Sequence, residues 1–537
     1  MDFLRWHAGV RISTVENHIF FPLKYWNEDG DMKLLGLKSL KIRLFFFVLS
    51  FSLYLFAAEI RVPVYSMPSK LDPITNLDVG STLIYGQVFD NLYYYNGNNQ
   101  LLPDLVLSHR ISADGKNIRM KIDTRRRFSD GSYLRAQDVV ASLQRAILTL
   151  KIESAWAFDN VVGFQQFLKN NKYPISIVAL DDKNIEIQLQ QASSIFLKIL
   201  SNKNLSVFKI NPQGQLLGTG PYKFKKIGKT EIVLDRNPFY PKQSSGSFDD
   251  LHFFLIESED EVLKNLASHK FDILPLGQDL TTIPSGYKVM EYPSMTTMIL
   301  MLDPKSPSFK NKDLRCQVIG QLTQSAKDAG YQWKGIEEGL PFSWDIFDKL
   351  HYGTKVSQKI KPSKIDLFYS TSNVGFFKNI DRQIEKSFKN KTQIPMSLHR
   401  VSHDQMMKGV RSKKISGLLL GISPDYVDPD AFLSPIVKTG QQYNHFKYSN
   451  PRLDNLIDEA KMIQNPSQRN AVYQKVFATI ANDCVIGLLG TKRQRFLVRE
   501  NLNFPRISGL GYFAIRLSEF QRMGHVLAEK NQDGDSL

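Results

Sequence analysis

The chain has 537 residues, of which 42% are hydrophobic, 23% are charged and 11% are aromatic. This composition excludes a fibre and a disordered protein, because enough apolar surface is present to offset the conformational entropy lost on folding. The length exceeds what one hydrophobic core accommodates, so we expect two or more lobes. A formal net charge of +16 permits attraction to anionic polymers or membrane surfaces but identifies no partner by itself.

A short apolar run lies near the N-terminus. Leu44–Ala58 reads LFFFVLSFSLYLFAA, follows the basic residues Lys38, Lys41 and Arg43, and precedes the polar residue Glu59. This layout is typical of a secretory signal peptide, and the run is short for a membrane-spanning helix. We therefore expect cleavage after Ala58 and a mature chain that begins at Glu59, with an uncleaved membrane anchor as the alternative.

A second methionine, Met32, begins MKLLGLKSLKIR, which is a normal opening for a signal peptide. We expect translation to start there, with residues 32–58 as the signal peptide and residues 1–31 as an upstream extension. No cysteine ends the apolar run, so the mature chain should be soluble and not a lipoprotein. For Cys316 and Cys484, a disulfide and two buried thiols both fit the sequence.

Short β-rich runs alternate with helical patterns after Glu59, which predicts a large α/β protein with mixed sheets. Strands are predicted at five runs of β-branched or alternating apolar residues, namely Ile118–Ile122, Ile185–Leu189, Glu231–Leu234, Leu251–Ile256 and Ser416–Leu420. Helices are predicted where apolar residues share one face, at Ala136–Leu150, Pro451–Ile463 and Asn470–Ile480.

Catalytic and metal-binding signatures are missing from the sequence. It contains no GxSxG, HExxH or GxxxxGK[ST] motif, and no CxxC pair that would indicate a structural zinc site. We therefore expect a protein that is not an enzyme and that holds no cofactor or metal. The densest basic cluster, Arg125–Arg127, lacks interleaved aromatic residues, so we interpret it as a solvated face and expect no nucleic-acid partner.

An ordered series of short motifs runs through nearly the whole mature chain. Its members are Leu71–Pro73 (LDP), Phe89–Leu92 (FDNL), Leu102–Leu105 (LPDL), Ser112–Gly115 (SADG), Phe128–Gly131 (FSDG), Ala136–Val139 (AQDV), Gly218–Tyr222 (GTGPY), Arg236–Tyr240 (RNPFY), Asp425–Pro429 (DYVDP) and Tyr448–Asp454 (YSNPRLD). In order and spacing the series resembles the large periplasmic solute-binding proteins of ABC transporters. These are the oligopeptide- and dipeptide-binding type of extracellular solute-binding protein family 5.

Turn chemistry also explains most of these motifs. Asp114-Gly115 and Asp130-Gly131 are tight-turn dipeptides. Gly218, Gly220 and Pro221 are interpreted as a turn, in which the two glycines leave the backbone angle φ unrestricted and the proline fixes it. Most motif residues are therefore interpreted as structural rather than as ligand contacts.

The resemblance implies an α/β, two-lobed periplasmic-binding-protein-like fold of the large peptide-binding type, with mixed sheets and an interlobe cleft. Lobe 1 would span residues 59–295, with an inserted subdomain at about 91–200, and lobe 2 would span 296–489. Residues 490–537 would return to lobe 1 and end in a C-terminal tail. A periplasmic monomer would then capture a peptide or peptide-like solute and deliver it to an ABC transporter permease, which would be its only link to a membrane.

The resemblance also indicates residues of the cleft. In peptide-binding relatives the first aspartate of the DYVDP-type motif pairs with the α-ammonium group of the peptide, which implies this role for Asp425, since a buried cation needs a counter-charge. A cap or loop role is the alternative for Asp425. Rough positional correspondence adds eight residues, which are Ser81, Thr82, Thr219, Gly220, Ser372, Asn373, His403 and Asn444.

Three aromatic positions depart from the family pattern and leave the ligand class open. Ile422 and Pro241 stand where tryptophan is usual, and Ile118–Met120 replaces an aromatic-rich run. One alternative is a binding protein for a metal chelate, a sugar or a cell-wall fragment. A secreted hydrolase with an unrecognised site and a basic protein that binds anionic envelope polymers are the other two.

Overall fold

The computed structural model divides the chain into two compact units, Met1–Ala57 and Ala58–Leu537. In the first unit, β1 (Lys24–Trp26) pairs with β2 (Met32–Leu34) in an antiparallel ladder. Apart from Met32–Leu34, the predicted signal peptide lies outside the described residues. The structure describes residues 24–26, 32–34 and 59–522, the last range with gaps at 69, 76–77, 242–247, 257–260, 262–270, 277–281, 329, 331–363, 371–385, 387–394, 442 and 492.

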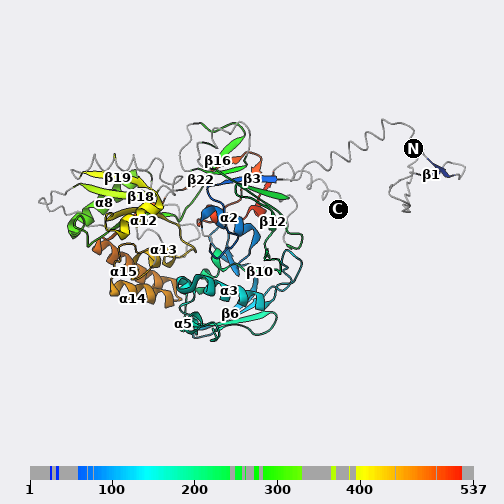
Figure 1. The fold of residues 1–537 in the computed structure, drawn as a ribbon, viewed down its shortest axis with the longest axis horizontal. Helices are drawn as coiled ribbons and strands as arrows, with labels where there is room; N and C mark the ends of the chain where they lie inside the picture. Colours follow the sequence, from blue (N-terminus) through cyan, green and yellow to red (C-terminus); the bar gives the residue numbers. More distant parts are fainter. Residues whose placement is uncertain are drawn as a thin grey trace. The chain divides into compact units, whose positions relative to one another are not determined.

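Two four-stranded sheets form the first part of the second unit (Figure 1). One sheet has the order β12-β13-β14-β3, and its strands are β12 (Tyr222–Ile227), β13 (Glu231–Arg236), β14 (Asp250–Leu255) and β3 (Glu59–Val64). The other has the order β6-β7-β9-β8, and its strands are β6 (Val106–Ile111), β7 (Asn117–Ile122), β9 (Asn184–Gln188) and β8 (Ile177–Ala179). We call this part lobe 1.

Lobe 1 is held together by one large apolar cluster, the first core, which gathers buried residues between 60 and 292 and between 496 and 520 and also includes Tyr426 and Ala431. Helix α3 (Ala136–Leu150) shows how the sequence pattern builds it, because Val139, Leu143 and Ile147 recur on one helical face and are fully buried. Its N-terminus is closed by the Asp138 carboxylate, which accepts a hydrogen bond of 2.7 Å from the Arg135 N–H. The predicted helix is thus confirmed with its bounds.

A five-stranded sheet with the order β19-β18-β20-β17-β21 forms the second part, which we call lobe 2. Its strands are β17 (Thr297–Leu302), β18 (Ile365–Ser370), β19 (Met396–Val401), β20 (Gly417–Ile422) and β21 (Ile486–Thr491). Side chains of β17 alternate between two cores, since Ile299 and Met301 belong to the second core and Met298, Leu300 and Leu302 to the third. The sheet is therefore buried on both faces.

Helices cover the two faces of this sheet. On one face α13 (Asp430–Val437), α14 (Pro451–Met462) and α15 (Pro466–Asp483) contribute to the second core, and on the other α8 (Lys312–Asp328) contributes to the third. Helix α12 (His403–Arg411) follows β19, and Figure 1 shows α14 and α15 side by side. The predicted helices at 451–463 and 470–480 are confirmed as α14 and α15, and the five predicted strands as β7, β9, β13, β14 and β20.

The chain returns toward lobe 1 after β21. Strand β22 (Gln494–Arg499) lies between β15 (Ile273–Leu276) and β16 (Tyr287–Tyr292) in a three-stranded sheet. Further on, the Gln87 side chain of α2 (Val79–Val88) donates to the Ile515 carbonyl at 2.8 Å and accepts from the Leu517 N–H at 2.9 Å.

The remaining elements are short. The strands and helices among them are β4 (Tyr93–Tyr95), β5 (Leu101–Pro103), α4 (Ala155–Phe158), α5 (Phe164–Lys169), α6 (Phe196–Ile199), β10 (Phe208–Ile210), β11 (Leu216–Gly218), β23 (Leu502–Asn503) and β24 (Gln521–Arg522). Turns of 3-10 helix lie at Lys151–Ser154, Lys203–Leu205, Tyr512–Ala514 and Leu517–Glu519.

The solvated face predicted at Arg125–Arg127 is wrong for its middle residue. The Arg126 side chain is 2% exposed and forms ion pairs with the buried carboxylates of Asp90 and Asp104. Arg125, by contrast, is exposed and pairs with Asp123 at 2.8 Å. A backbone hydrogen bond of 3.1 Å from the Arg126 N–H to the Asp123 carbonyl turns the chain here, so adjacent arginines face opposite environments.

Glycine stands at these motif positions for two different structural reasons. Gly115 and Gly131 have φ angles of 72° and 87°, which confirms the tight turns predicted for the two Asp-Gly dipeptides. Gly218 and Gly220 were expected to supply a free φ, and that reason is wrong. A Cβ atom would lie 2.0 Å from the Val88 carbonyl oxygen at Gly218 and 2.6 Å from it at Gly220, so close backbone approach requires glycine there.

Cys316 and Cys484 form a disulfide that joins α8 to the end of α15. Their Cα atoms are 5.0 Å apart, and 168 residues separate them in sequence. The bond settles the question that the sequence left open, and the described residues contain no free cysteine. It closes a long chain loop, which restricts the unfolded chain and thereby stabilises the folded one.

Replacing both cysteines by serine should lower the free energy of unfolding by about 2–4 kcal/mol. The loss should appear as a lower midpoint of thermal unfolding followed by circular dichroism. A reducing agent should bring the wild-type midpoint down to that of the variant while leaving the variant unchanged. Equal midpoints for the oxidised wild type and the variant would contradict a stabilising role.

Candidate functional site

Candidate site residues gather at one edge of the five-stranded sheet. Strands β19 and β20 both run parallel to β18, so the carboxyl ends of all three lie at the same edge. His403 follows β19, and Asp425 follows β20. In open α/β sheets, ligands bind outside the carboxyl ends of the strands. Ser372 and Asn373 come two and three residues after the end of β18 but lie outside the described residues.

Asp425 combines two properties that rarely occur together. Its side chain is exposed, yet burial within the surrounding protein raises its pKa to about 6, an effect that a hydrogen bond from the Asn202 side chain only partly offsets. A carboxylate on an open convex surface is not desolvated in this way. The two properties are explained if Asp425 faces a solvent-accessible space that is enclosed by protein.

Lobe 1 supplies the groups that face this loop of lobe 2. Asn202 precedes the 3-10 turn Lys203–Leu205, and its Oδ1 atom accepts from the Asn204 N–H at 2.9 Å. The amide nitrogen of Asn202 is therefore the group left to donate to Asp425. Tyr95 of β4 packs against both the first and the second core, and its hydroxyl lies beside the backbone amide of Val427. Asp425 thus lies where the two lobes meet.

Two further titratable groups with shifted pKa values lie near these elements. Lys203 is only partly exposed, and burial together with repulsion from Arg516 lowers its pKa to about 8. Burial and repulsion from His403 likewise lower the pKa of His445. His403 itself is exposed at the first turn of α12.

Ser81 and Thr82, by contrast, belong to the start of α2. The Ser81 hydroxyl donates to Asp78 at 2.5 Å and its N–H donates to the same carboxylate at 2.9 Å, which caps the helix. The Thr82 N–H donates to the Asp78 carbonyl at 2.9 Å. In this structure the polar groups of Ser81 serve the helix start, and a ligand role for either residue stays a prediction.

Thr219, Gly220 and Asn444 also have structural partners. The Thr219 hydroxyl donates to Asp90 at 3.0 Å, and the Gly220 N–H donates to the Val88 carbonyl at 2.9 Å. Asn444 is buried and exchanges hydrogen bonds with the backbone of Tyr448, at 2.7 Å to its carbonyl and 2.9 Å from its N–H. These contacts do not bring the three residues to Asp425, so their ligand role also stays a prediction.

Comparison with known proteins shows which family the chain resembles. The model for bacterial extracellular solute-binding proteins, family 5 Middle, matches residues 100–316. The probable D,D-dipeptide-binding periplasmic protein of Escherichia coli strain K12 is 24% identical in an alignment 477 residues long, which covers 81% of this chain and 89% of that protein. The chain is similar to the proteins of extracellular solute-binding protein family 5.

Solved structures of periplasmic binding proteins are similar to this chain over most of its length. The murein tripeptide binding protein of Escherichia coli has a TM-score of 0.69 at 17% identity, covering 87% of this chain and 98% of its own. NikZ from Campylobacter jejuni, solved in complex with Ni(L-His), has a TM-score of 0.69 at 16% identity, covering 87% and 100%. The two-lobed α/β fold of periplasmic binding proteins, predicted from the motif series, is confirmed.

Sequence reasoning missed several polar residues at the junction of the two lobes. Asn202, Lys198 and Asp428 make contacts there, and neither Asn202 nor Lys198 carried a signal that separates it from an ordinary surface or loop residue. Asp428 stands in the same motif as Asp425, and this was the one signal available to find it. Among the described residues, no cluster of His, Cys, Asp or Glu is arranged to hold a metal ion, and no helix is long and apolar enough to cross a membrane.

Proposed function

We propose that this protein captures a peptide or peptide-like solute between its two lobes and delivers it to an ABC transporter permease. Asp425 carries the proposal, because a desolvated but accessible carboxylate is suited to pair with the α-ammonium group of a peptide. The relatives named above are binding proteins, and we propose the same role, binding without turnover, for this chain. His403, Ser372 and Asn373 are proposed to lie near the ligand.

The proposed mechanism is closure of the lobes around the solute. A ligand that contacts both lobes shifts the population toward the closed form, because only that form offers both sets of contacts. Asp425 fixes the amino end, while hydrogen bonds along the peptide backbone, as in strand addition, tolerate different side chains. Asn202 then holds the same carboxylate from lobe 1, so one charged group touches both the ligand and the opposite lobe.

We further propose the boundaries and the cellular form of the protein. Lobe 1 comprises about 59–295, with an insertion at about 91–200, lobe 2 comprises 296–489, and residues 490–537 return to lobe 1. The return is supported by β22, which pairs with β15 and β16. The mature chain is proposed to be a soluble periplasmic monomer, released by cleavage after Ala58 and without a lipid anchor.

Native mass spectrometry tests the proposed function most directly. The mature chain from Glu59 would be purified from a periplasm without denaturation, and the molecules that it releases would be identified. A mixture of short peptides is the expected result and would also show their preferred length. A single non-peptide mass, or an empty protein that no peptide mixture stabilises, would overturn both the peptide assignment and the role of Asp425.

A non-peptide solute is the second candidate, and two observations favour it. NikZ has the same fold and was solved with a nickel chelate, and this chain has Ile422 where an aromatic residue is usual next to the motif loop. Calorimetry that compares free-amino peptides with metal chelates, sugars and cell-wall fragments separates the two candidates. Measurable heat of binding for only one of the non-peptide classes would support the second candidate, a non-peptide solute.

Peptide binding through Asp425 should weaken in acid. The α-ammonium group stays charged below pH 7, whereas the carboxylate becomes protonated as the pH falls through its pKa of about 6. The dissociation constant of a free-amino peptide should therefore rise about tenfold between pH 7 and pH 5. Titration calorimetry at pH 7, 6 and 5 measures it. An N-acetylated peptide has no such charge, so an equal pH dependence for both peptides would contradict the pairing.

A further inference from the structure

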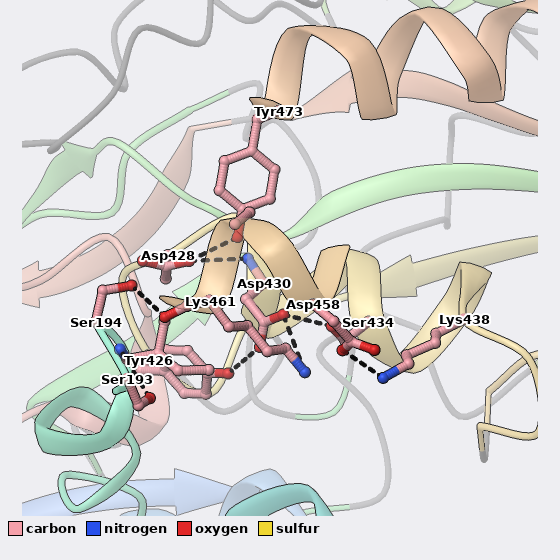
Figure 2. A network of polar contacts seen from close by, with 12 residues as sticks. Ser193, Ser194, Tyr426, Asp428, Asp430, Ser434, Lys438, Asp458, Lys461 and Tyr473 are labelled. Atoms are coloured by element: carbon pink, nitrogen blue, oxygen red, sulfur yellow. Dashed lines mark hydrogen bonds and ion pairs between the residues drawn. The ribbon is translucent and has the colours of Figure 1, made fainter. Parts of the chain in front are cut away.

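The segment that contains α6 in lobe 1 contacts the motif loop of lobe 2. The Ser194 N–H and hydroxyl both donate to the carbonyl of Lys461, at 2.8 and 2.9 Å, near the end of α14. The Lys198 ammonium of α6 lies 2.6 Å from an Asp428 carboxylate oxygen. These bonds join Ser194 and Lys198 of lobe 1 to Lys461 and Asp428 of lobe 2, and Asn202 in the same part of lobe 1 interacts with Asp425. Figure 2 shows Ser194 beside Lys461 and near the loop that carries Asp428.

Asp428 has its main partners within lobe 2. Arg469 of α15 donates to both of its carboxylate oxygens at 2.6 Å, and the Asp430 N–H donates to one of them at 3.0 Å. Arg469 is in turn held by the Tyr473 hydroxyl, which accepts from it at 3.0 Å. Both members of this pair belong to lobe 2. Lys198 is the one charged partner of Asp428 that comes from lobe 1 among the described residues.

The charges that meet across this junction are complementary. Lobe 1 brings the cation Lys198 to Asp428 and the anion Asp159 toward Lys461. Lys461 is also balanced within its own lobe, since its ammonium lies 3.5 Å from Asp430. Pairing of opposite charges across an interface favours one docked arrangement and disfavours displaced ones. The junction therefore has the properties of a specific contact rather than of a chance approach.

We propose that Lys198 and Asp428 form a clasp that holds the two lobes together and so sets the population of the closed form. Lys198 is a positioning residue in this scheme, because it stabilises closure without contacting the solute. Asp428 stands three residues after Asp425 in the same loop, so the clasp lies next to the carboxylate proposed to bind the solute. The inference rests on the proposed closure of the lobes but not on the chemical identity of the solute.

Loss of the clasp should weaken every solute by the same factor. The apparent affinity scales with the fraction of the binding-competent closed form, so a drop in this fraction affects all ligands equally. Lys198→Met removes the charge but keeps an apolar stem, and we expect the dissociation constant to rise about tenfold for free-amino and N-acetylated peptides alike. Lys198→Arg keeps the cation and should restore most of the affinity.

The test compares the mature wild type with Lys198→Met, Lys198→Arg and Lys223→Met. Lys223 is the matched control, because its 2.7 Å ion pair with Asp235 lies entirely within lobe 1. Small-angle scattering measures the radius of gyration without ligand and with saturating tri-alanine, and calorimetry measures the affinity for tri-alanine and its N-acetylated form. We expect a larger radius for Lys198→Met only.

The outcomes separate the clasp from the proposed function. Should tri-alanine not bind while Lys198→Met still expands the ligand-free protein, the clasp stands and the peptide assignment fails. Should tri-alanine bind wild type and Lys198→Met equally, with identical scattering, the clasp is overturned and the peptide assignment stands. A loss confined to the free-amino peptide would also overturn it, because Lys198 would then act on the ligand itself.

Discussion

Replacing Arg126 by methionine should lower the free energy of unfolding by about 3–5 kcal/mol, or prevent folding altogether. Methionine retains much of the apolar volume but leaves the carboxylates of Asp90 and Asp104 without this counter-charge in the first core. Both carboxylates are at most 2% exposed. The guanidinium also donates to the Thr219 carbonyl at 3.3 Å and lies 4.8 Å above the Tyr240 ring, so several contacts disappear at once.

The two carboxylates do not depend on Arg126 to the same extent. Asp104 also pairs with Arg516, and the two arginines together outweigh the effect of burial and lower the pKa of Asp104. For Asp90, burial and repulsion from Asp104 prevail and raise its pKa. Asp90 is therefore the group that Arg126→Met leaves least compensated. Adding Asp90→Asn to Arg126→Met should recover part of the lost stability, since the amide carries no charge.

Chemical unfolding monitored by circular dichroism measures these differences, with Arg125→Met as the matched control. Arg125 is the adjacent residue, its side chain is 78% exposed, and its ion pair with Asp123 lies at the surface. Exposed pairs contribute about 0–1 kcal/mol, so the control should unfold nearly as the wild type does. Similar losses for both arginine variants would show that Arg126 is not a buried counter-ion of the first core.

The elements that the sequence predicted well depend on local pattern. Helix α3 has its predicted bounds because its apolar residues recur at helical spacing and Asp138 caps its start. The tight turns at Gly115 and Gly131 likewise follow from dipeptides that favour positive φ. The burial of Arg126 has no local signal, because it depends on carboxylates that lie 22 and 36 residues away and on a turn that directs one arginine of three inward.

The sequence likewise predicted only part of the candidate site. Asp425 was indicated by a motif within one loop, and the structure places it at the carboxyl edge of the sheet. Asn202, which contacts it, belongs to the other lobe, and the Lys198 contact to Asp428 spans 230 residues of sequence. No periodicity or spacing in the sequence predicts a contact between residues so far apart. The disulfide between Cys316 and Cys484 is similar, because residue types alone do not determine whether distant cysteines meet.

Replacing Asp425 by asparagine should weaken the binding of a free-amino peptide by about 30-fold to several thousand-fold. Truncating one member of a buried, hydrogen-bonded charge pair costs about 2–5 kcal/mol, and each 1.4 kcal/mol corresponds to a factor of ten. Asparagine has nearly the same shape, and it removes only the charge that pairs with the α-ammonium group. Titration calorimetry with tri-alanine at pH 7 measures the change.

The same substitution should not destabilise the ligand-free protein. Burial raises the pKa of Asp425, which means that the folded chain disfavours its charged form relative to the unfolded chain. A neutral amide removes this penalty at pH 7, where the wild-type residue is ionised. Thermal unfolding of Asp425→Asn should therefore occur at or above the wild-type midpoint, so weaker binding would not be a consequence of unfolding.

An N-acetylated peptide distinguishes charge pairing from a general loss of the site. It has no α-ammonium group, so its affinity should be nearly the same for the wild type and for Asp425→Asn. Asp313→Asn is the matched variant, because Asp313 is an exposed carboxylate in the first turn of α8. Helix α8 contributes to the third core, whereas Val427 of the motif loop belongs to the second core on the opposite face of the sheet. It should leave both affinities unchanged. Equal losses of affinity for the free and the acetylated peptide would show that Asp425 stabilises its own loop and does not bind the amino end of the solute.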